Sequence, residues 1–272
     1  MNFDLNEWIN LLLRWGHVFA GILWVGTTFY FTWLDGRFAE LEEQKQNGAG
    51  GNEPPAKQVW MVHSGGFYVV EKLKKPNVMP GKLHWFRWEA ALTWLTGILL
   101  FMLVYYHGRI LVETEDSRIS HATAMVLSVV LLAAGWLVYD VMWSSRLFAN
   151  EKIGVTFSYA LLVGTTWCLF HFFASRAACF QLGAMLGTIM TANVWMRILP
   201  AQRRMVRALS QGQVPDQAQA MRAKARSKHN TFIVLPVVFL MLSYHYPGTY
   251  HWCIVSLLVL LGWAAAKFLR RA

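Results

Sequence analysis

The hydrophobic positions of this chain fall into long, nearly uninterrupted runs that are separated by polar or charged connections. A helix that crosses a bilayer needs about 20 mostly apolar residues, because the hydrocarbon core is roughly 30 Å thick. Seven runs satisfy or approach this length, and they lie near Trp8–Leu34, Trp88–Tyr106, His121–Trp143, Val155–Phe173, Ala177–Leu199, Thr231–Tyr246 and His251–Leu269. The pattern predicts an all-α integral membrane protein, a polytopic bundle of about seven transmembrane helices, forming a single domain over residues 1–272.

Composition agrees with a membrane location. The chain is 56% hydrophobic and 15% charged, which is more apolar than an ordinary soluble domain. The first run follows Asp4 and Glu7 rather than basic residues, so we interpret it as a span and not as a cleavable signal.

The net charge is +10, and the distribution of the basic residues along the chain indicates the orientation in the membrane. In a soluble protein this charge would suggest nucleic acid, but here the basic residues concentrate in the connections, above all in residues 200–230. Short connections rich in Lys and Arg stay in the cytoplasm. We therefore predict cytoplasmic loops over 35–87 and 200–230, with the N-terminus outside and the C-terminus inside. The expected partner is the lipid bilayer, with no nucleic acid.

A histidine inside the first run raises the question of a cofactor. An ionisable side chain in a span costs about 2.5–3.5 kcal/mol on insertion scales, so His17 needs a reason to be there. Gly21 lies one turn later on the same helix face and would leave room beside the imidazole for a flat macrocycle, and b-type haem accepts an axial histidine. The alternative is that Gly21 permits close helix packing while His17 hydrogen-bonds a neighbouring helix. Both interpretations stay open.

A second axial ligand to a haem iron would come from the same half of the membrane. We prefer His245, because Pro247 and Gly248 predict a turn around it, with His171 as the other candidate at suitable depth. The alternative for His245 is an ordinary place in an aromatic belt beside Tyr246. None of the three cysteines stands in a C-x-x-C-H motif, so covalently attached haem is not expected.

A second group of polar residues is predicted at the cytoplasmic face. Its members offer proton-transfer and anion-pairing groups, and they are His63, Glu71, Lys72, His84, Glu89, His229 and Asn230. The pair Gly65–Gly66 would let backbone amides approach a ligand closely. Trp85 would wall a planar ligand, while Asn193 and Arg203 would bind it. A flat, anionic small molecule fits this inventory. The alternative is an interfacial belt of snorkelling lysines and carboxylates.

Five blocks of the sequence resemble a known family. They read "LLLRWGHVFAGILWVGTTFYFTWLD", "VHSGGFYVVEK", "LHWFRWEAALTWLTG", "GTIMTANVWMRILPAQRRMVRAL" and "ARSKHNTFIVLPVVFLMLSYHYP". In this order they are similar to the membrane domain of PuuD-type, cytochrome-c-linked bacterial urate oxidases, also called urate hydroxylases. The first block also resembles, more weakly, the first span of CopD-like proteins and of membrane protoporphyrinogen oxidases that hold haem b.

The resemblance implies a multi-pass protein of the bacterial inner membrane that oxidises urate, or a related purine, to 5-hydroxyisourate. Electrons would pass through haem b, with its iron held by His17 and His245, to a c-type cytochrome. Members of the family often carry a C-terminal cytochrome c domain, which is absent from these residues, so a separate cytochrome is expected. Two other functions stay open: a non-catalytic haem b subunit that relays electrons, and a transporter of small anions.

Overall fold

The computed structural model describes residues 4–46, 58–73, 76, 79–113, 117–148 and 150–270. Its main elements are eight α-helices: α1 (Leu5–Gln46), α2 (Trp88–Phe101), α3 (His121–Ser144), α4 (Glu151–Phe172), α5 (Ser175–Ala192), α6 (Leu199–Ser210), α7 (Gln217–Leu242) and α8 (Trp252–Leu269). Two strands form one antiparallel hairpin: β1 (Gln58–His63) and β2 (Gly66–Glu71). Two π-helical turns continue α2 and α5: η1 (Met102–His107) and η3 (Asn193–Ile198). Three short 3₁₀ turns complete the set: η2 (Arg146–Phe148), η4 (Ser243–His245) and η5 (Pro247–Thr249).

The predicted membrane fold is confirmed as a mostly helical bundle. Within the described residues, 6 helices are long and apolar enough to cross a bilayer. They correspond to the predicted spans except the sixth, which falls in α7. That helix begins with polar and basic residues, and only its second half, 231–242, is apolar. We therefore treat 231–242 as the membrane part of α7 and the residues before it as lying outside the span.

Local sequence explains where two of the spans begin. Ser120 precedes α3, and its hydroxyl accepts a hydrogen bond from the Thr123 amide at 3.1 Å. Asn150 precedes α4 and accepts from the Lys152 amide at 3.0 Å. Such caps satisfy backbone N–H groups that the first turn of a helix leaves without partners.

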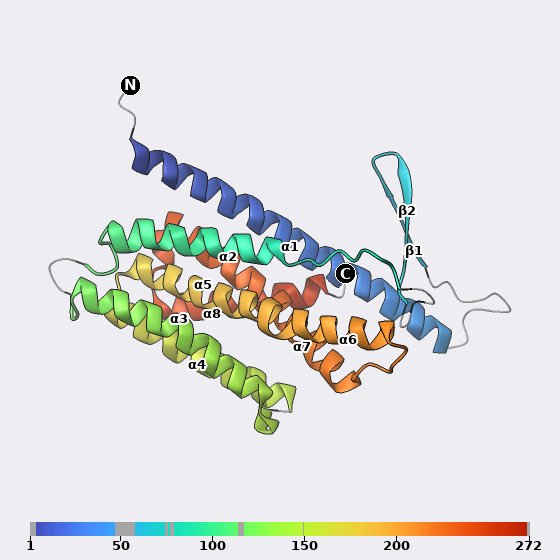
Figure 1. Cartoon of the computed structure of the whole chain (residues 1–272). Coiled ribbons are helices and arrows are strands. Elements are labelled where there is room, and N and C mark those ends of the chain that lie inside the picture. Colours follow the sequence, from blue (N-terminus) through green and yellow to red (C-terminus); the bar gives the residue numbers. More distant parts are fainter. Residues whose placement is uncertain are drawn as a thin grey trace.

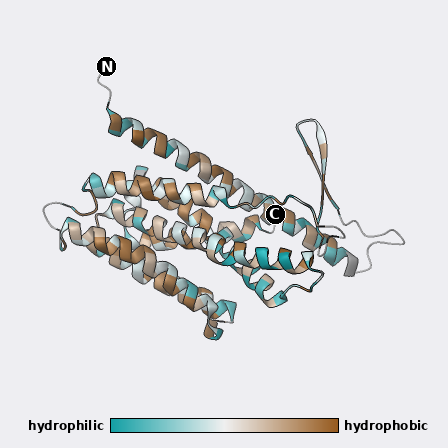
Figure 2. Cartoon of the chain, in the orientation of Figure 1, coloured by the Kyte–Doolittle hydropathy of each residue, from teal (hydrophilic) through white to brown (hydrophobic). Residues whose placement is uncertain are grey.

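The helices run in alternating directions, so that α1 begins at one end of the bundle and α8 finishes at the other (Figure 1). This agrees with an odd number of crossings. Hydrophilic colours gather on α6 and on the first turns of α7, at the end where α8 finishes (Figure 2). The basic residues of 200–230 thus lie at one end of the molecule, and the orientation with this end in the cytoplasm stays a prediction.

The centre of the bundle is the continuous helix made by α5, η3 and α6. In its most apolar stretch 67% of the residues are buried, against 6–22% in the other five candidate spans. The exposed apolar side chains of those five, such as Trp15 and Ile22 on α1, suit contact with lipid. Deep in the bundle, Gln181 on α5 donates to the Ser128 carbonyl at 3.0 Å, and the Ser128 hydroxyl donates back to Gln181 at 2.6 Å.

The two predicted loops contain regular structure. In 35–87, α1 continues twelve residues beyond Leu34 to Gln46, helped by an Arg37–Glu40 ion pair at 2.8 Å, and the β1–β2 hairpin follows. The hairpin packs Val59 against Leu34 and Phe38 of α1. In 200–230, the chain forms most of α6 and the first half of α7. Where the structure describes these two regions, they therefore contain helix and hairpin as well as loop.

Candidate functional site

His63 and its glycines form the tip of the β1–β2 hairpin. Ser64 and Gly65 both have positive φ, at 49° and 76°, and Gly66 pairs with His63 across the strands. Two successive positive φ values are typical of the two-residue turn that suits a twisted hairpin, so Gly65 serves the turn. His63 is exposed, and the hairpin projects away from the helices (Figure 1). The structure therefore does not bring His63 to the other predicted site residues.

Glu71 and Lys72 lie at the base of the same hairpin. Lys72 forms an ion pair with Asp35 on α1, and its ammonium lies 5.8 Å from the centre of the Phe38 ring. Glu71 is exposed and pairs with Gln58 in the strand register. In this arrangement Lys72 attaches the hairpin to α1, which differs from the predicted role in pairing with a ligand anion.

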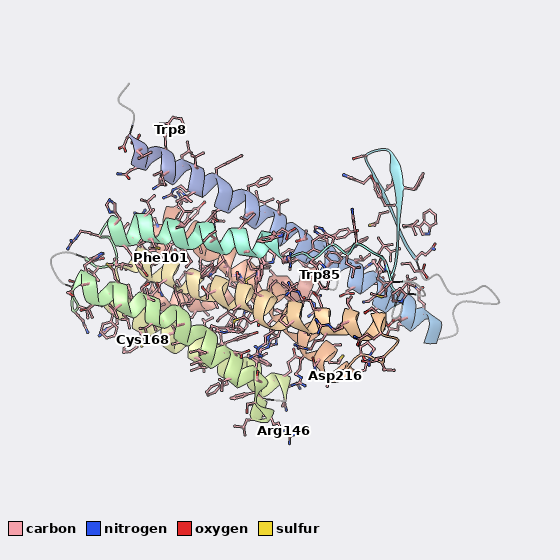
Figure 3. The ribbon with its side chains drawn as sticks, viewed as in Figure 1. Trp8, Trp85, Phe101, Arg146, Cys168 and Asp216 are labelled. Carbon is pink, nitrogen blue, oxygen red and sulfur yellow. The ribbon has the colours of Figure 1, made fainter. Side chains whose placement is uncertain are left out.

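The residues before and at the start of α2 form a separate aromatic group. The His84 ring lies 4.4 Å from Phe86, which contacts Phe31 of α1 at 5.0 Å between ring centres. Trp85 packs on a small apolar cluster that includes Val194 of η3, and Glu89 lies in the first turn of α2. Figure 3 shows Trp85 at the end of the bundle where α2 begins, away from Trp8 at the far end of α1.

Three predicted residues do come together, around the hydroxyl of Tyr139 on α3. The Asn193 amide on η3 donates to the Tyr139 oxygen at 3.0 Å and to the Asn230 side-chain oxygen on α7 at 2.9 Å. Tyr139 Oη lies 2.7 Å from His229 Nδ1. Asn230 in turn donates to the Met190 carbonyl at 3.0 Å. We call Tyr139, Asn193, His229 and Asn230 the polar cluster.

A charge network adjoins the polar cluster, in which Arg226 is buried and Arg197 is exposed. Asp140, next to Tyr139, accepts hydrogen bonds from Arg197 Nε at 2.8 Å and from Arg226 Nη2 at 3.0 Å. Arg226 is only 5% exposed, and its guanidinium lies 4.8 Å from the Tyr139 ring centre. Ser144 accepts a further bond from Arg226 at 3.1 Å. One carboxylate thus neutralises part of the charge of two arginines, as a buried ion pair requires.

The π-helical turn η3 contributes two side chains to this region. Asn193 begins η3 and contacts Tyr139, while Arg197 within the same turn contacts Asp140. The two residues are four apart and so share a helix face, which directs an amide and a guanidinium at two successive residues of α3. π turns inside α-helices are frequent at functional sites.

The polar cluster borders a large cavity. The cavity has a volume of about 880 Å³, is open on one side, and is lined by residues of α3, α4, α5, α7 and α8. Tyr139 and His229 line it together with Trp143, whose ring lies 4.2 Å from the imidazole. Lys228 and Glu151, which form an ion pair, also line it. Ligand pockets of roughly 300–1,000 Å³ with a few convergent polar groups are typical binding sites.

The hydrogen bonds assign a protonation state to His229. Because the Tyr139 oxygen accepts from Asn193, its own O–H is free to donate to His229 Nδ1, which leaves the proton of a neutral imidazole on Nε2. His229 precedes the apolar half of α7, and burial, together with the charge of Arg226, lowers its pKa from 6.5 to about 4. At neutral pH, His229 is therefore a neutral donor at Nε2.

Two buried polar atoms in this region have no hydrogen-bond partner among the described residues: Asn193 Oδ1, an acceptor, and Arg226 Nη1, a donor. Both side chains contact Tyr139. A buried polar atom without a partner costs about 1–3 kcal/mol, so such atoms often mark the place of a ligand or a water.

His17 bonds to α2, as the packing interpretation expects. Its Nδ1 lies 2.9 Å from the Thr93 carbonyl and 3.2 Å from the Thr96 hydroxyl. The ring occupies the space left by Gly97, where a β-carbon would lie 2.9 Å from His17 Cε1. Gly21 faces the Thr93 methyl, and a β-carbon at Gly21 would lie 3.9 Å from it, an ordinary contact between α1 and α2.

One of these contacts, between His17 Nδ1 and the Thr93 carbonyl, also suits an axial haem ligand. An axial histidine usually donates its other ring N–H to a backbone carbonyl, and Thr93 can accept it from Nδ1, which leaves Nε2 for iron. Gly21, by contrast, lies against α2. His245 is exposed in η4, after the end of α7. Among the described residues, no group of three His, Cys, Asp or Glu could hold a bare metal ion.

Sequence reasoning missed Tyr139, Asp140, Arg197 and Arg226. A signal was available, because Asp140 stands inside an apolar run where a charge is costly. Arg203 was predicted instead of Arg197, and both arginines are exposed. The spacing favours Arg197, because it lies four residues after Asn193 on the same helix face, whereas Arg203 lies ten residues after it.

Taken together, the bundle and its buried polar cluster define a polytopic helical membrane protein with an internal polar site at the end of an apolar cavity. The chain belongs to the urate oxidase N-terminal family, whose model matches residues 4–272. No curated protein and no solved structure matches the chain. Membership implies a urate-related substrate and suggests an oxidoreductase.

Proposed function

We propose that this protein is a membrane urate oxidase that converts urate to 5-hydroxyisourate at the polar cluster. The observation that carries the proposal is the Asn193–Tyr139–His229 hydrogen-bond chain at the wall of the 880 Å³ cavity, in a chain of the urate oxidase N-terminal family. Urate is planar, and its ring edge alternates N–H and C=O groups. Its carbonyl groups can therefore accept from the His229 imidazole, and its flat ring fits beside Trp143 at the cavity wall.

The residues divide the work of binding and proton transfer. His229 Nε2–H supplies a donor to a carbonyl oxygen or to a deprotonated ring nitrogen, and an anionic purine loses electrons more readily than a neutral one. Tyr139 fixes the imidazole, as a hydrogen-bonded partner does in other acid–base sites. Trp143 and Tyr139 provide aromatic walls for a flat ring. The cavity has mainly apolar walls, which strengthen these polar contacts.

The oxidation needs an electron acceptor. The proposed route from the family resemblance is a haem b held by His17 and His245, followed by a separate c-type cytochrome, in the bacterial inner membrane. Haem would supply one-electron transfer when bound. The side chain that fits it is His17, through the Thr93 carbonyl on Nδ1. Helix α1 meets α7 near the polar cluster, where the Thr32 hydroxyl lies 3.4 Å from that of Thr231, the residue after Asn230. His17 lies fifteen residues before Thr32, so it is about 22 Å along α1 from this contact.

The test is urate turnover by purified protein with ferricyanide, a soluble one-electron acceptor that needs no partner protein. We expect loss of urate coupled to reduction of ferricyanide, and a loss of most of this activity in His229→Gln. The matched control is His121→Gln, because His121 bonds the Tyr106 carbonyl at 3.0 Å, outside the polar cluster. Urate uptake into vesicles without any redox change would instead favour the transporter.

A further inference from the structure

One face of the β1–β2 hairpin, the inner face, packs on the end of α1. Side chains alternate between the two faces of a strand, so Val59 and Met61 share the inner face. Val59 contacts Leu34 and Phe38, and the Tyr30 hydroxyl donates to the Met61 sulfur at 3.6 Å. Tyr30 and Leu34 belong to the last turns of the apolar run of α1. The hairpin therefore lies at the level where α1 leaves the hydrocarbon core.

The opposite face of the hairpin carries four large apolar residues that are exposed. They form two cross-strand pairs, Trp60 with Val69 and Val62 with Phe67, and they are 64%, 44%, 71% and 79% exposed in that order. We call these four residues the outer face. From residue 59 to residue 70 the sequence has no Asp, Glu, Lys or Arg. An apolar strand surface without charges is a liability in water, and proteins normally cover it.

The place of the hairpin beside α1 indicates a lipid surface. Figure 1 shows the hairpin standing out to one side of α1 rather than continuing beyond its end. Tyr30, Phe31 and Trp33 in the last apolar turns of α1 are exposed. Tryptophan and tyrosine gather where a span meets the headgroup layer. Through the contact of Tyr30 with Met61, the hairpin extends this aromatic belt sideways from α1.

The size of the outer face and the strand edges beside it indicate how deep the hairpin lies. Four residues are far fewer than the roughly 20–30 residues that each partner contributes to a stable protein–protein interface. In the part of the chain that the structure describes, the sheet consists of these two strands, so each strand has an unpaired edge. Hydrocarbon would leave the N–H and C=O groups of these edges without partners, whereas the headgroup layer supplies polar groups and water.

We propose that the outer face lies in the headgroup layer of the bilayer, against the ends of the acyl chains, and anchors the hairpin to the membrane surface beside α1. The apolar side chains contact lipid, as the apolar face of an interfacial amphipathic helix does, and the strand edges contact water and headgroups. The partner is the bilayer surface. The proposal goes beyond the proposed function and is independent of it, since no residue of the polar cluster takes part.

The test places a fluorescent thiol probe on the outer face and measures which quencher reaches it. Val62→Cys and Phe67→Cys are made in separate proteins, so that the test does not depend on one variant that fails to fold. In both, the accessible cysteines Cys168 and Cys253 are replaced by alanine, while Cys179 is kept because it is buried. The protein is placed in lipid nanodiscs that hold one chain each, so both membrane surfaces are open to solution.

Two exposed aliphatic residues provide matched control positions for the same probe. Ile22→Cys labels the lipid-facing side of α1, and Val214→Cys labels the connection between α6 and α7. The quenchers are iodide in solution, and phospholipids that carry a nitroxide either on the headgroup or deep in the acyl chain. We expect the headgroup nitroxide to quench both outer-face probes at least about threefold more than the Val214 probe, and iodide to quench them at least about threefold less. The deep nitroxide should act most on the Ile22 probe.

A second pair of variants tests whether the outer face itself holds the probe in lipid. Trp60→Ser combined with Val69→Ser should raise iodide quenching of the Val62 probe toward the level at Val214. His63→Ser should leave it unchanged, because His63 is exposed but lies on the inner face with Val59 and Met61.

Three results would overturn the proposal. Iodide quenching equal to that at Val214 would place the outer face in water. Quenching by neither iodide nor nitroxide would mean that protein covers the outer face. Deep-nitroxide quenching equal to that at Ile22 would place the hairpin in the hydrocarbon core.

Discussion

The Tyr139 hydroxyl joins three helices, so its removal is a sharp test of the polar cluster. In Tyr139→Phe the ring stays, but Asn193 loses an acceptor at 3.0 Å and His229 Nδ1 loses its partner at 2.7 Å. Each buried polar group left without a partner costs about 1–3 kcal/mol. The His229 ring is then free to turn or to change tautomer, so it no longer presents Nε2–H to the substrate. If the same 1–3 kcal/mol is lost from the stabilisation of the transition state, kcat/KM for urate falls by about 5-fold to 150-fold.

The assay is urate-dependent reduction of ferricyanide, with the thermal unfolding midpoint recorded in the same detergent. Tyr159→Phe is the control, because the Tyr159 hydroxyl also donates one bond, to the Ser256 carbonyl at 3.1 Å, but far from the polar cluster. Both variants should lose some thermal stability. Only Tyr139→Phe should lose turnover. Equal kcat/KM in the two variants would refute the role of the hydrogen-bond chain.

Three further predictions concern the charge network, the first helix and pH. Asp140→Ala leaves the buried guanidinium of Arg226 without its carboxylate, so we expect a loss of about 3–5 kcal/mol in unfolding free energy, and an unchanged unfolding midpoint would argue against the pairing. If haem is bound, His17→Ala should abolish the Soret band and Gly97→Val should shift it, because a β-carbon at 97 lies 2.9 Å from His17 Cε1; a normal band in His17→Ala would exclude this ligand. Burial, and then the charge of Arg226, lower the pKa of His229 from 6.5 to about 4 on folding. The unfolded chain therefore binds the proton more readily than the folded protein does. The free energy of unfolding should decline as pH drops from about 6.5 toward about 4. His229→Gln should flatten this decline, and an identical pH dependence of the unfolding midpoint in both proteins would contradict it.

The spans could be predicted because their length is set by the bilayer. Asn193 stood out because a polar group at membrane depth needs a partner, and His229 and Asn230 stood out as polar residues at the predicted cytoplasmic face. Their shared partner, Tyr139, could not be found in this way. A tyrosine in an apolar run looks like any aromatic residue, and its contact with α5 and α7 is made only by tertiary packing. The family resemblance carried more information about substrate than any single spacing did.

The residues predicted to form one site at the cytoplasmic face do not all come together, because the β1–β2 hairpin holds His63 away from the others. Residues 58–71 contain two six-residue runs with a Ser64–Gly65 turn, but the polar stretch before them made the region look like a loop. Once the strands pair, His63 is carried to the exposed tip, away from His229. In the first helix, His17 and Gly21 have the spacing of a haem pocket and of a helix contact alike, and only the position of Thr93 shows which neighbour they meet.

The measurement that tests the account most directly is equilibrium binding of radiolabelled urate to two matched variants, His229→Gln and His84→Gln. The first histidine belongs to the polar cluster, and the second lies in the aromatic group before α2. We predict that His229→Gln weakens urate binding by about tenfold, which is the loss of one buried hydrogen bond to a charged group, and that His84→Gln binds urate as the wild type does. Normal binding in His229→Gln, with the loss in His84→Gln, would move the substrate to the start of α2 and contradict the site described here.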